Sequence, residues 1–327
     1  MIIASAPTRL DFGGGWTDVP PYPEERGGFV CNLAIERRAT VVWHTAPPAH
    51  GAEQSGPDPL IAAALRSAAR RPGWAERVAA TPTIELRSDF PVGAGLGGSS
   101  AAGVALAATC AVAYGEQLTP AALAERSRAT EVEELRVAGG FQDHYAAAFG
   151  GALGLTLGQT RHAEPLPLTQ ATRRCLEARL TLVYTGESRI SAETITAVLD
   201  AYAAREARVV AALDRMASLA RDMAEALSSG DISSLGALMD EHWVHQQSLH
   251  PRITTPRIAA LEATVRAAGA VGFKALGASG GGCVLVCSSI EQAPAVRAVA
   301  ATLGEVLDWQ VATDGVRVQV VSEDTDG

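Results

Sequence analysis

The chain has 327 residues, of which 47 % are hydrophobic and 19 % are charged, and its formal net charge is −9. This composition is typical of a globular protein with one large or two modest domains, and the acidic balance argues against a nucleic acid or an anionic membrane as partner. The five cysteines form no CxxC pair, and no basic segment leads into an apolar run at the N-terminus. We therefore expect buried thiols and a cytoplasmic protein.

Residues 2–12 mix apolar and β-favouring residues, which predicts a short strand pair or an edge strand. They run into GGGWTDVPPYPEERGG, residues 13–28, an irregular loop stiffened by prolines. A glycine triplet beside Trp16, Thr17 and Asp18 suits a sugar site, because a flat ring covers the apolar face of a sugar and a carboxylate accepts hydrogen bonds from its hydroxyls. The alternative is a surface loop in which Trp16 fills the core.

The residues that follow predict strands on either side of one helix in the sequence. Residues 29–47 alternate like one or two strands, and residues 61–81 predict a helix that is interrupted at Pro72 and Gly73. Residues 83–88 (TIELRS) predict a further strand.

A glycine loop follows that strand, with the sequence PVGAGLGGSSAAG running into an alanine-rich helix. Such a loop binds anions, because unpaired N–H groups at a helix N-terminus point outward and the helix dipole adds partial positive charge. It contains a GxGxxG pattern but lacks the second strand and acid of a dinucleotide fold, and it also lacks the lysine of a mononucleotide loop. A glycine-rich turn with N-cap serines is the alternative. The residues that we expect to form a phosphate loop are Pro91, Gly93, Ala94, Gly95, Leu96, Gly97, Gly98, Ser99, Ser100 and Ala101.

A second informative stretch is ATEVEELRVAGGFQDHY, which places Glu131, Glu133 and Glu134 at the end of a helix that begins near Thr119. Acids at a helix C-terminus oppose the dipole, which favours a metal or partner role for them. A solvated face is the ordinary interpretation of a short charge run and stays open. A glycine pair then breaks the helix before another helical turn.

The second half of the chain alternates helices and strands, which predicts an α+β region with an antiparallel sheet. It starts with a linker-like stretch, RHAEPLPL. The expected elements are a strand within RLTLVY, helices at 192–228 with a break near Arg208, 231–249, 257–269 and 291–303, a glycine loop at 277–282, and the strands CVLVCS and VRVQVV. His242, His245 and His250 lack the spacing of a zinc helix, so we expect them on the surface or in a groove.

Three motifs in order resemble the signatures of the GHMP small-molecule kinases: APTRLDFGGGWTDVPPY, PVGAGLGGSSAAG and KALGASGGGCVLV. The resemblance implies phosphoryl transfer with ATP and Mg²⁺. It also implies an α+β, two-lobed fold, with an N-terminal lobe like ribosomal S5 domain 2 at residues 1–160 and a ferredoxin-like C-terminal lobe at residues 161–327.

The resemblance further implies roles for single residues. Asp143 matches the catalytic Asp, and Arg9 is expected near it or near the transferred phosphate. Ser99 matches the metal-binding Ser, with Ser100 as alternative, and Glu133 is preferred over Glu131 as the metal-binding Glu. The residues expected to bind the substrate are Gly14, Gly15, Trp16, Thr17, Asp18, Tyr22, Asp143, Gly280 and Gly281.

Within the family, FGGGWTDVPPYPEERGG and DEHWVHQQSLHPRITTP look most like the sugar 1-kinase branch that contains D-glycero-D-manno-heptose 7-phosphate kinase and L-fucokinase. This implies phosphorylation of the anomeric C1 hydroxyl of a heptose 7-phosphate or related sugar by a monomer or homodimer. Gln246 and Gln247 stand where relatives often carry lysines, which favours a free sugar as the alternative. A mevalonate-type kinase and an inactive sugar or nucleotide sensor are the other rivals.

Overall fold

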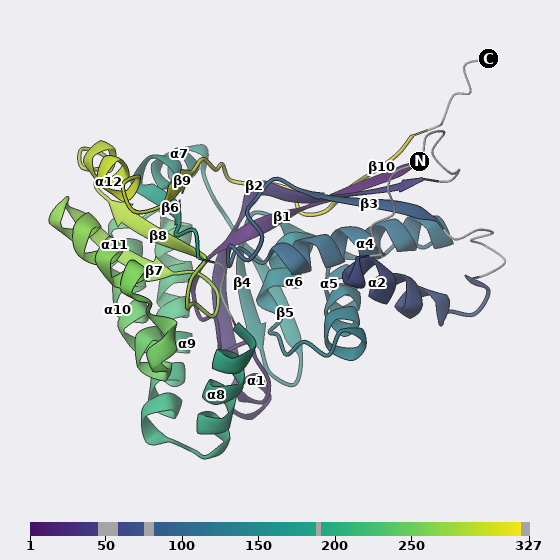
Figure 1. Cartoon of the computed structure of the whole chain (residues 1–327), viewed down its shortest axis with the longest axis horizontal. Coiled ribbons are helices and arrows are strands. Elements are labelled where there is room, and N and C mark those ends of the chain that lie inside the picture. Colours follow the sequence, from purple (N-terminus) through teal and green to yellow (C-terminus); the bar gives the residue numbers. More distant parts are fainter. Residues whose placement is uncertain (45–57, 75–81, 188–190, 322–327) are drawn as a thin grey trace.

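A computed structural model describes residues 1–44, 58–74, 82–187 and 191–321 of the chain. Two antiparallel sheets and the helices packed on them form two lobes (Figure 1). In the described residues the first lobe has a six-stranded sheet in the order β10-β1-β2-β4-β5, with β3 also paired to β2. The second lobe has a four-stranded sheet in the order β7-β8-β6-β9. This mixture of helices and sheets confirms the predicted α+β class.

The strands of the first sheet are β1 (Ile2–Gly13), β2 (Gly28–His44), β3 (Thr83–Ser88), β4 (Ala152–Leu157), β5 (Arg161–Leu166) and β10 (Arg317–Val320). Those of the second sheet are β6 (Leu180–Tyr184), β7 (Ala270–Ala275), β8 (Cys283–Ser288) and β9 (Glu305–Leu307). The helices are α1 (Tyr22–Arg26), α2 (Pro59–Ala69), α4 (Gly98–Tyr114), α5 (Pro120–Ala129), α6 (Gln142–Phe149), α7 (Gln170–Arg179), α8 (Ser191–Ala203), α9 (Ala207–Ser229), α10 (Ile232–Leu249), α11 (Pro256–Ala267) and α12 (Ala293–Ala300), with short turns η1 (Thr130–Glu134) and η2 (Pro251–Ile253).

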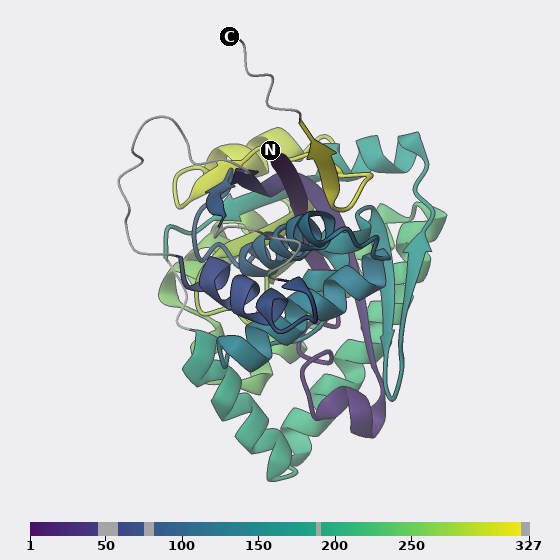
Figure 2. The same ribbon diagram turned by 90° about the vertical axis from the view of Figure 1, so that its right-hand side faces the viewer.

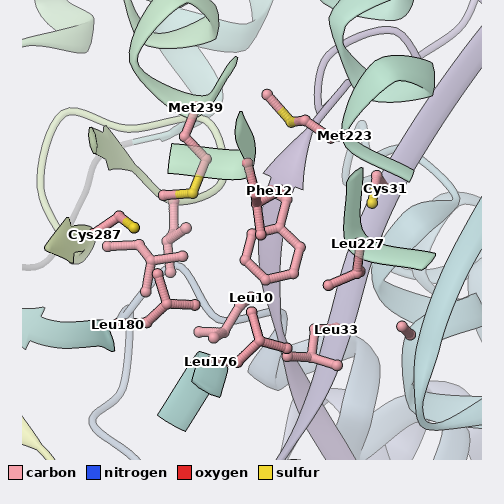
Figure 3. Close-up of a cluster of buried hydrophobic side chains, with 14 of the residues drawn as sticks. Leu10, Phe12, Cys31, Leu33, Leu176, Leu180, Met223, Leu227, Met239 and Cys287 are labelled. Carbon is pink, nitrogen blue, oxygen red and sulfur yellow. The ribbon is translucent and has the colours of Figure 1, made fainter. Parts of the chain in front are cut away.

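Strand β1 lies at the centre of the molecule. Buried and partly exposed residues alternate from Ile2 to Ser5, whereas every residue from Ala6 to Gly13 is buried. Side chains alternate between the two faces of a strand, so the change means that the second half of β1 is covered on both faces. Leu10 and Phe12 pack into a core that includes residues of α9, α10 and the second sheet (Figure 3). Strand β1 therefore connects the two lobes.

Three segments differ from the sequence prediction. Residues 2–12 are part of one long strand and do not form a strand pair. The linker-like stretch RHAEPLPL contains β5, which pairs with β4. The terminal strand VRVQVV contains β10, which lies beside β1 in the first sheet (Figure 2). Both β5 and β10 therefore belong to the first sheet, although they follow the expected lobe boundary at residue 160.

The helices follow the predicted pattern more closely. The break expected near Arg208 lies at residues 204–206, between α8 and α9, and the helix expected after residue 60 is α2. The predictions for residues 45–47 and 75–81 lie outside the described residues. In the part of the chain that the structure describes, no helix is both long and apolar enough to cross a membrane.

A buried ion pair joins the two sheets. The Lys274 ammonium in β7 donates to the Asp11 backbone carbonyl at 2.7 Å and lies 3.1 Å from Asp11 Oδ2 in β1. The two side chains are 0 % and 1 % exposed. Burial alone would raise the pKa of Asp11, but the charges of Lys274 and Arg9 hold it below its usual value. The lobes are thus held together by a desolvated charge pair in addition to apolar packing.

Replacing Lys274 should destabilise the protein strongly, because Asp11 would keep a buried charge without a partner. We expect Lys274→Met to lower the free energy of unfolding by about 3–5 kcal/mol in urea titrations. The double variant Asp11→Asn/Lys274→Met should recover most of that loss, since no charge is then left alone. Arg215→Met, which breaks the exposed pair with Glu241, is the control and should cost less than about 1 kcal/mol. Equal losses of unfolding free energy in Lys274→Met and Arg215→Met would contradict a special role for the buried pair.

Candidate active site

A pocket lies where the two lobes meet. Its lining comes from β1, the loop after β1, the glycine loop, η1, the start of α6 and the loop after β7. Among the predicted site residues, those that line it are Arg9, Trp16, Asp18, Ser99, Ser100 and Asp143. Segments from both ends of the chain thus meet at one site.

The predicted phosphate loop has a regular backbone. Gly93, Gly95 and Gly97 have φ angles of +73°, +73° and +75°, a left-handed conformation that glycine adopts without strain. Between them, Ala94 and Leu96 are buried in the core. Gly97 is the N-cap of α4 and supplies no side-chain cap, so the first N–H groups of this helix stay open. An anion at this helix N-terminus would meet those donors.

The loop is fixed to both lobes through its carbonyl groups. The Leu96 carbonyl accepts from the Arg9 backbone N–H at 3.1 Å, and the Ala94 carbonyl accepts from the Cys283 N–H at 2.7 Å. The phosphate loop is therefore joined to β1 on one side and to the start of β8 on the other.

Arg9 and Asp143 form the central ion pair of the pocket. Arg9 Nε and Nη2 lie 2.8 Å and 2.7 Å from Asp143 Oδ1, and Arg9 Nη1 donates to the Gly95 carbonyl at 2.6 Å. Arg9 is 2 % exposed, while Asp143 is 23 % exposed and faces the pocket. A Cβ on Gly97 would lie 2.9 Å from Asp143 Cγ, so only glycine lets the carboxylate lie this close to the phosphate loop.

Asp18 caps the helix that carries Asp143. Its Oδ2 accepts from the backbone N–H groups of Phe141 and Gln142 at 2.8 Å and 2.9 Å. A Cβ on Gly140 would lie 1.9 Å from this oxygen, which explains the second glycine of the GGFQDHY stretch. Burial raises the pKa of Asp18 to about 6, and the nearby carboxylates of Asp143 and Asp11 add to the rise against the two N–H donors.

Glu131, and not Glu133, lies beside the predicted metal-binding serine. Glu131 Oε1 accepts from Ser99 Oγ at 3.2 Å, whereas Glu133 is exposed and does not line the pocket. The reason is helix spacing: Glu131 follows the buried Ser127 by four residues and shares its face of the helix, whereas Glu133 lies on the exposed side. Glu134 forms ion pairs with Arg66 of α2 and with Arg70, the residue that follows this helix. Of the two acids that the sequence offers as metal ligands, the structure thus brings Glu131, and not the preferred Glu133, next to Ser99.

Several residues that were predicted to bind the substrate do not line the pocket, and instead make contacts elsewhere. Thr17 Oγ1 donates to the Gly14 carbonyl at 2.7 Å, and Tyr22 Oη donates to Asp214 at 2.9 Å. Gly280 lies by a separate surface pocket, and Gly281 lies against the Glu187 carbonyl. From that third motif, Gly277 and Ala278 line the pocket instead.

His242 differs from the prediction, since it is fully buried rather than on the surface or in a groove. Its Nε2 accepts from the Gly14 N–H at 2.9 Å, and burial lowers its pKa to about 3. The sequence reasoning also gave no role to Gln142 and His144, which line the pocket. Their only signal was their position on either side of Asp143.

The free energy of unfolding should change with pH as the Asp18 carboxyl group ionises. Because its folded-state pKa of about 6 lies above the ordinary 3.8, its contribution is complete below about pH 4 and is lost as the pH rises through 6. Asparagine cannot ionise but can still accept a helix N–H. We therefore expect the stability of Asp18→Asn relative to wild type to rise by about 3 kcal/mol from about pH 4 to pH 7 in urea titrations.

The control for this titration is Asp214→Asn. The pKa of Asp214 is lowered: burial would raise it, but the hydrogen bonds from Arg26 and Tyr22 prevail. Its pH dependence should have the opposite sign, since the contribution of Asp214 is present at neutral pH and is lost on acidification. Parallel pH curves for Asp18→Asn and wild type would contradict the assignment to Asp18.

Comparison with known proteins agrees with this geometry. Residues 60–151 match the model of the GHMP kinases N terminal domain, and residues 223–305 match that of the GHMP kinases C terminal. A crystal structure of a D-glycero-D-manno-heptose 1-phosphate kinase from Bacteroides thetaiotaomicron has a TM-score of 0.77 at 22 % identity, over 99 % of this chain and 100 % of the other. The galactokinase of Lactococcus lactis has a TM-score of 0.72 at 13 % identity, over 97 % and 95 %. These two likenesses show the fold.

Curated relatives include two bifunctional proteins. The fucokinase/GDP-fucose pyrophosphorylase of Arabidopsis thaliana and the L-fucokinase/L-fucose-1-P guanylyltransferase of Bacteroides fragilis are each 26 % identical, over 86 % and 90 % of this chain. The chain spans only 29 % and 35 % of their lengths. The mevalonate kinase of Pyrococcus furiosus is 26 % identical over 73 % of this chain and 69 % of its own. Together, the two domain matches and the shared fold show that the chain belongs to the GHMP kinase family.

Proposed function

We propose that this kinase transfers the γ-phosphate of ATP to the anomeric C1 hydroxyl of a heptose 7-phosphate or a related sugar. The observation that carries the proposal is the position of Asp143, between the phosphate loop at Gly97 and the sugar-type loop at Asp18. An acceptor hydroxyl beside this carboxylate would face a phosphate bound at the N-terminus of α4. Similarity to proteins named heptose 1-phosphate kinase and fucokinase supports a sugar as acceptor.

The chain's own residues would act by positioning and by charge. Both Arg9 contacts use Asp143 Oδ1, which leaves Oδ2 to accept a hydrogen bond from the acceptor hydroxyl and to orient it. The open N–H groups at the start of α4 would hold the phosphates, and the Arg9 guanidinium lies within the same pocket. Such positioning and charge compensation are what phosphoryl transfer requires from a protein.

The residues present fit Mg²⁺. Ser99 Oγ and the Glu131 carboxylate offer hard oxygen ligands 3.2 Å apart beside the phosphate loop. Among the described residues no group of three or more His, Cys, Asp or Glu could hold a metal alone, which suits an ion that also binds substrate phosphates. When bound, Mg²⁺ would neutralise part of the phosphate charge. We assign its protein ligands to Ser99 and Glu131.

A free sugar is the second candidate substrate, and the charge of the pocket favours it. The described lining has three carboxylates, Asp18, Glu131 and Asp143, while its one Arg or Lys side chain, Arg9, is already paired. Gln246 cannot substitute for a phosphate-binding lysine, because it is buried and donates to the Gly277 carbonyl at 3.0 Å. The Trp16 indole N–H is buried without a hydrogen-bond partner in the described residues and could serve a sugar hydroxyl.

The proposal is tested by measuring ADP release with D-glycero-D-manno-heptose 7-phosphate, the unphosphorylated heptose, L-fucose and D-galactose. We expect one of these acceptors to give a C1 phosphate, detected by phosphorus NMR. Asp143→Ala should lower kcat at least about 10³-fold while changing the Kd for ATP little, because it removes the group that orients the hydroxyl. No turnover with any aldose would contradict the sugar assignment, and an unchanged kcat in Asp143→Ala would contradict the role of Asp143.

A pair of variants separates the two candidate metal ligands. Glu131→Gln should raise the Mg²⁺ concentration needed for half-maximal activity by at least about tenfold, because an amide oxygen is a weaker ligand than a carboxylate for a hard cation. Glu133→Gln is the matched control on the same helical turn and should behave like wild type, since Glu133 is exposed. A larger effect in Glu133→Gln than in Glu131→Gln would restore the prediction made from the sequence.

A further inference from the structure

We propose that His144 is a positioning residue, which holds the Glu131 carboxylate toward Ser99 so that it is ready for the divalent metal of the nucleotide. The inference rests on the proposed function only in its use of a metal–nucleotide complex. Its test contains no sugar, so an error in the sugar assignment would leave the result unchanged.

The geometry starts from the side chain of His144. It lies in α6 directly after Asp143 and is 2 % exposed. Its Nε2 lies 2.9 Å from Glu131 Oε2, and its Nδ1 lies 2.9 Å from Ser127 Oγ. A carboxylate only accepts hydrogen bonds, so Nε2 must carry the proton and donate to Glu131. In the neutral imidazole, Nδ1 then accepts from the Ser127 hydroxyl.

The two oxygens of the Glu131 carboxylate face different partners. Oε2 faces His144, and Ser100 Oγ lies 3.5 Å from the same oxygen. Oε1 faces Ser99 at 3.2 Å, on the side of the phosphate loop. His144 is the closer of these two donors, so without it rotation about the last bond of the glutamate would be less restricted. His144 therefore fixes which oxygen is presented.

The partner of His144 is itself fixed by close packing. A Cβ on Gly103 of α4 would lie 2.4 Å from Ser127 Oγ, so the hydroxyl that orients the imidazole is packed tightly between α4 and α5. The series Ser127, His144 and Glu131 thus runs from a rigid helix contact to the edge of the phosphate loop. Groups that orient metal ligands in this way typically change metal affinity by about 10–100-fold when they are removed.

Two polar replacements test the role separately from a structural one. Glutamine places its amide N–H near the position of Nε2, so His144→Gln should keep the donor to Glu131. Asparagine is shorter and places its amide near Nδ1, so His144→Asn should lose that donor. Tyr145→Phe is the matched control, because Tyr145 also donates from α6 to a carboxylate of α5, Glu125, at 2.6 Å, outside the pocket.

The measurement is the Kd of ADP by calorimetry, once in EDTA and once in saturating Mg²⁺, with the ratio of the two constants taken as the metal enhancement. We expect His144→Asn to lower this enhancement at least about tenfold with the metal-free Kd unchanged, and His144→Gln to keep the wild-type enhancement. Tyr145→Phe should leave the enhancement unchanged even if its melting temperature falls. Ser127→Ala, which keeps the imidazole, should lower it by about threefold.

The outcomes that overturn the proposal are equally specific. They are a wild-type enhancement in His144→Asn, or a loss in His144→Gln as large as that in His144→Asn. An equal loss in Tyr145→Phe would also overturn it, because general destabilisation of α6 would then be the cause. If His144→Asn does not fold, Ser127→Ala decides, and an unchanged enhancement in that variant counts against the proposal. Absence of any Mg²⁺-dependent ADP binding by wild type would instead overturn the proposed function.

Discussion

The buried contact between Asp11 and Lys274 is the constraint on which the site depends. A charge without water needs its partner, so separation of the lobes would have to hydrate both groups or leave both isolated. Asp11 lies two residues after Arg9, and side chains at that spacing share one face of a strand. The contact that joins the sheets therefore also fixes the segment of β1 from which Arg9 reaches Asp143.

The helix that carries Asp143 is likewise held by a residue from another segment. Helix α6 begins at a residue without a side-chain cap of its own, and its first N–H groups are satisfied by Asp18 from the N-terminal loop. The loop that carries Asp18 and helix α6 are thus joined at this point. The raised pKa of Asp18 follows from its burial, so this connection is weakest when the carboxylate is charged.

Much of the candidate site could be predicted from the sequence, because glycines mark positions where the backbone lies close to another group. Gly97 and Gly140 are places where a Cβ would collide with Asp143 and Asp18. The choice between Glu131 and Glu133 could not be predicted in this way, since it depends on which face of the helix is buried: Glu131 shares a face with Ser127, four residues earlier, and the burial of Ser127 appears only in the fold. The burial of His242 likewise depends on Gly14, which lies 228 positions away.

The edge strand β5 was not predicted. All six of its positions are exposed or partly exposed and it contains a proline, so the hydrophobic alternation of a strand is missing. Its pairing with β4, and not its composition, makes it a strand. The strand β10 was predicted from its alternation, but its place beside β1 was not. Polar segments beside a buried sheet are therefore easily taken for linkers.

The position of β10 also has a consequence for how the protein folds. The Met1 ammonium donates to the Val321 carbonyl at 3.0 Å, across 320 positions of sequence, and the Val321 N–H donates to the Met1 carbonyl at 2.9 Å. During synthesis the first strand therefore leaves the ribosome long before its outer neighbour exists. Until the last strand arrives, the open edge of β1 presents unpaired backbone groups to the cell, and closing so long a loop is slow. The first lobe, whose synthesis starts with β1, is therefore complete only after β10 has been made.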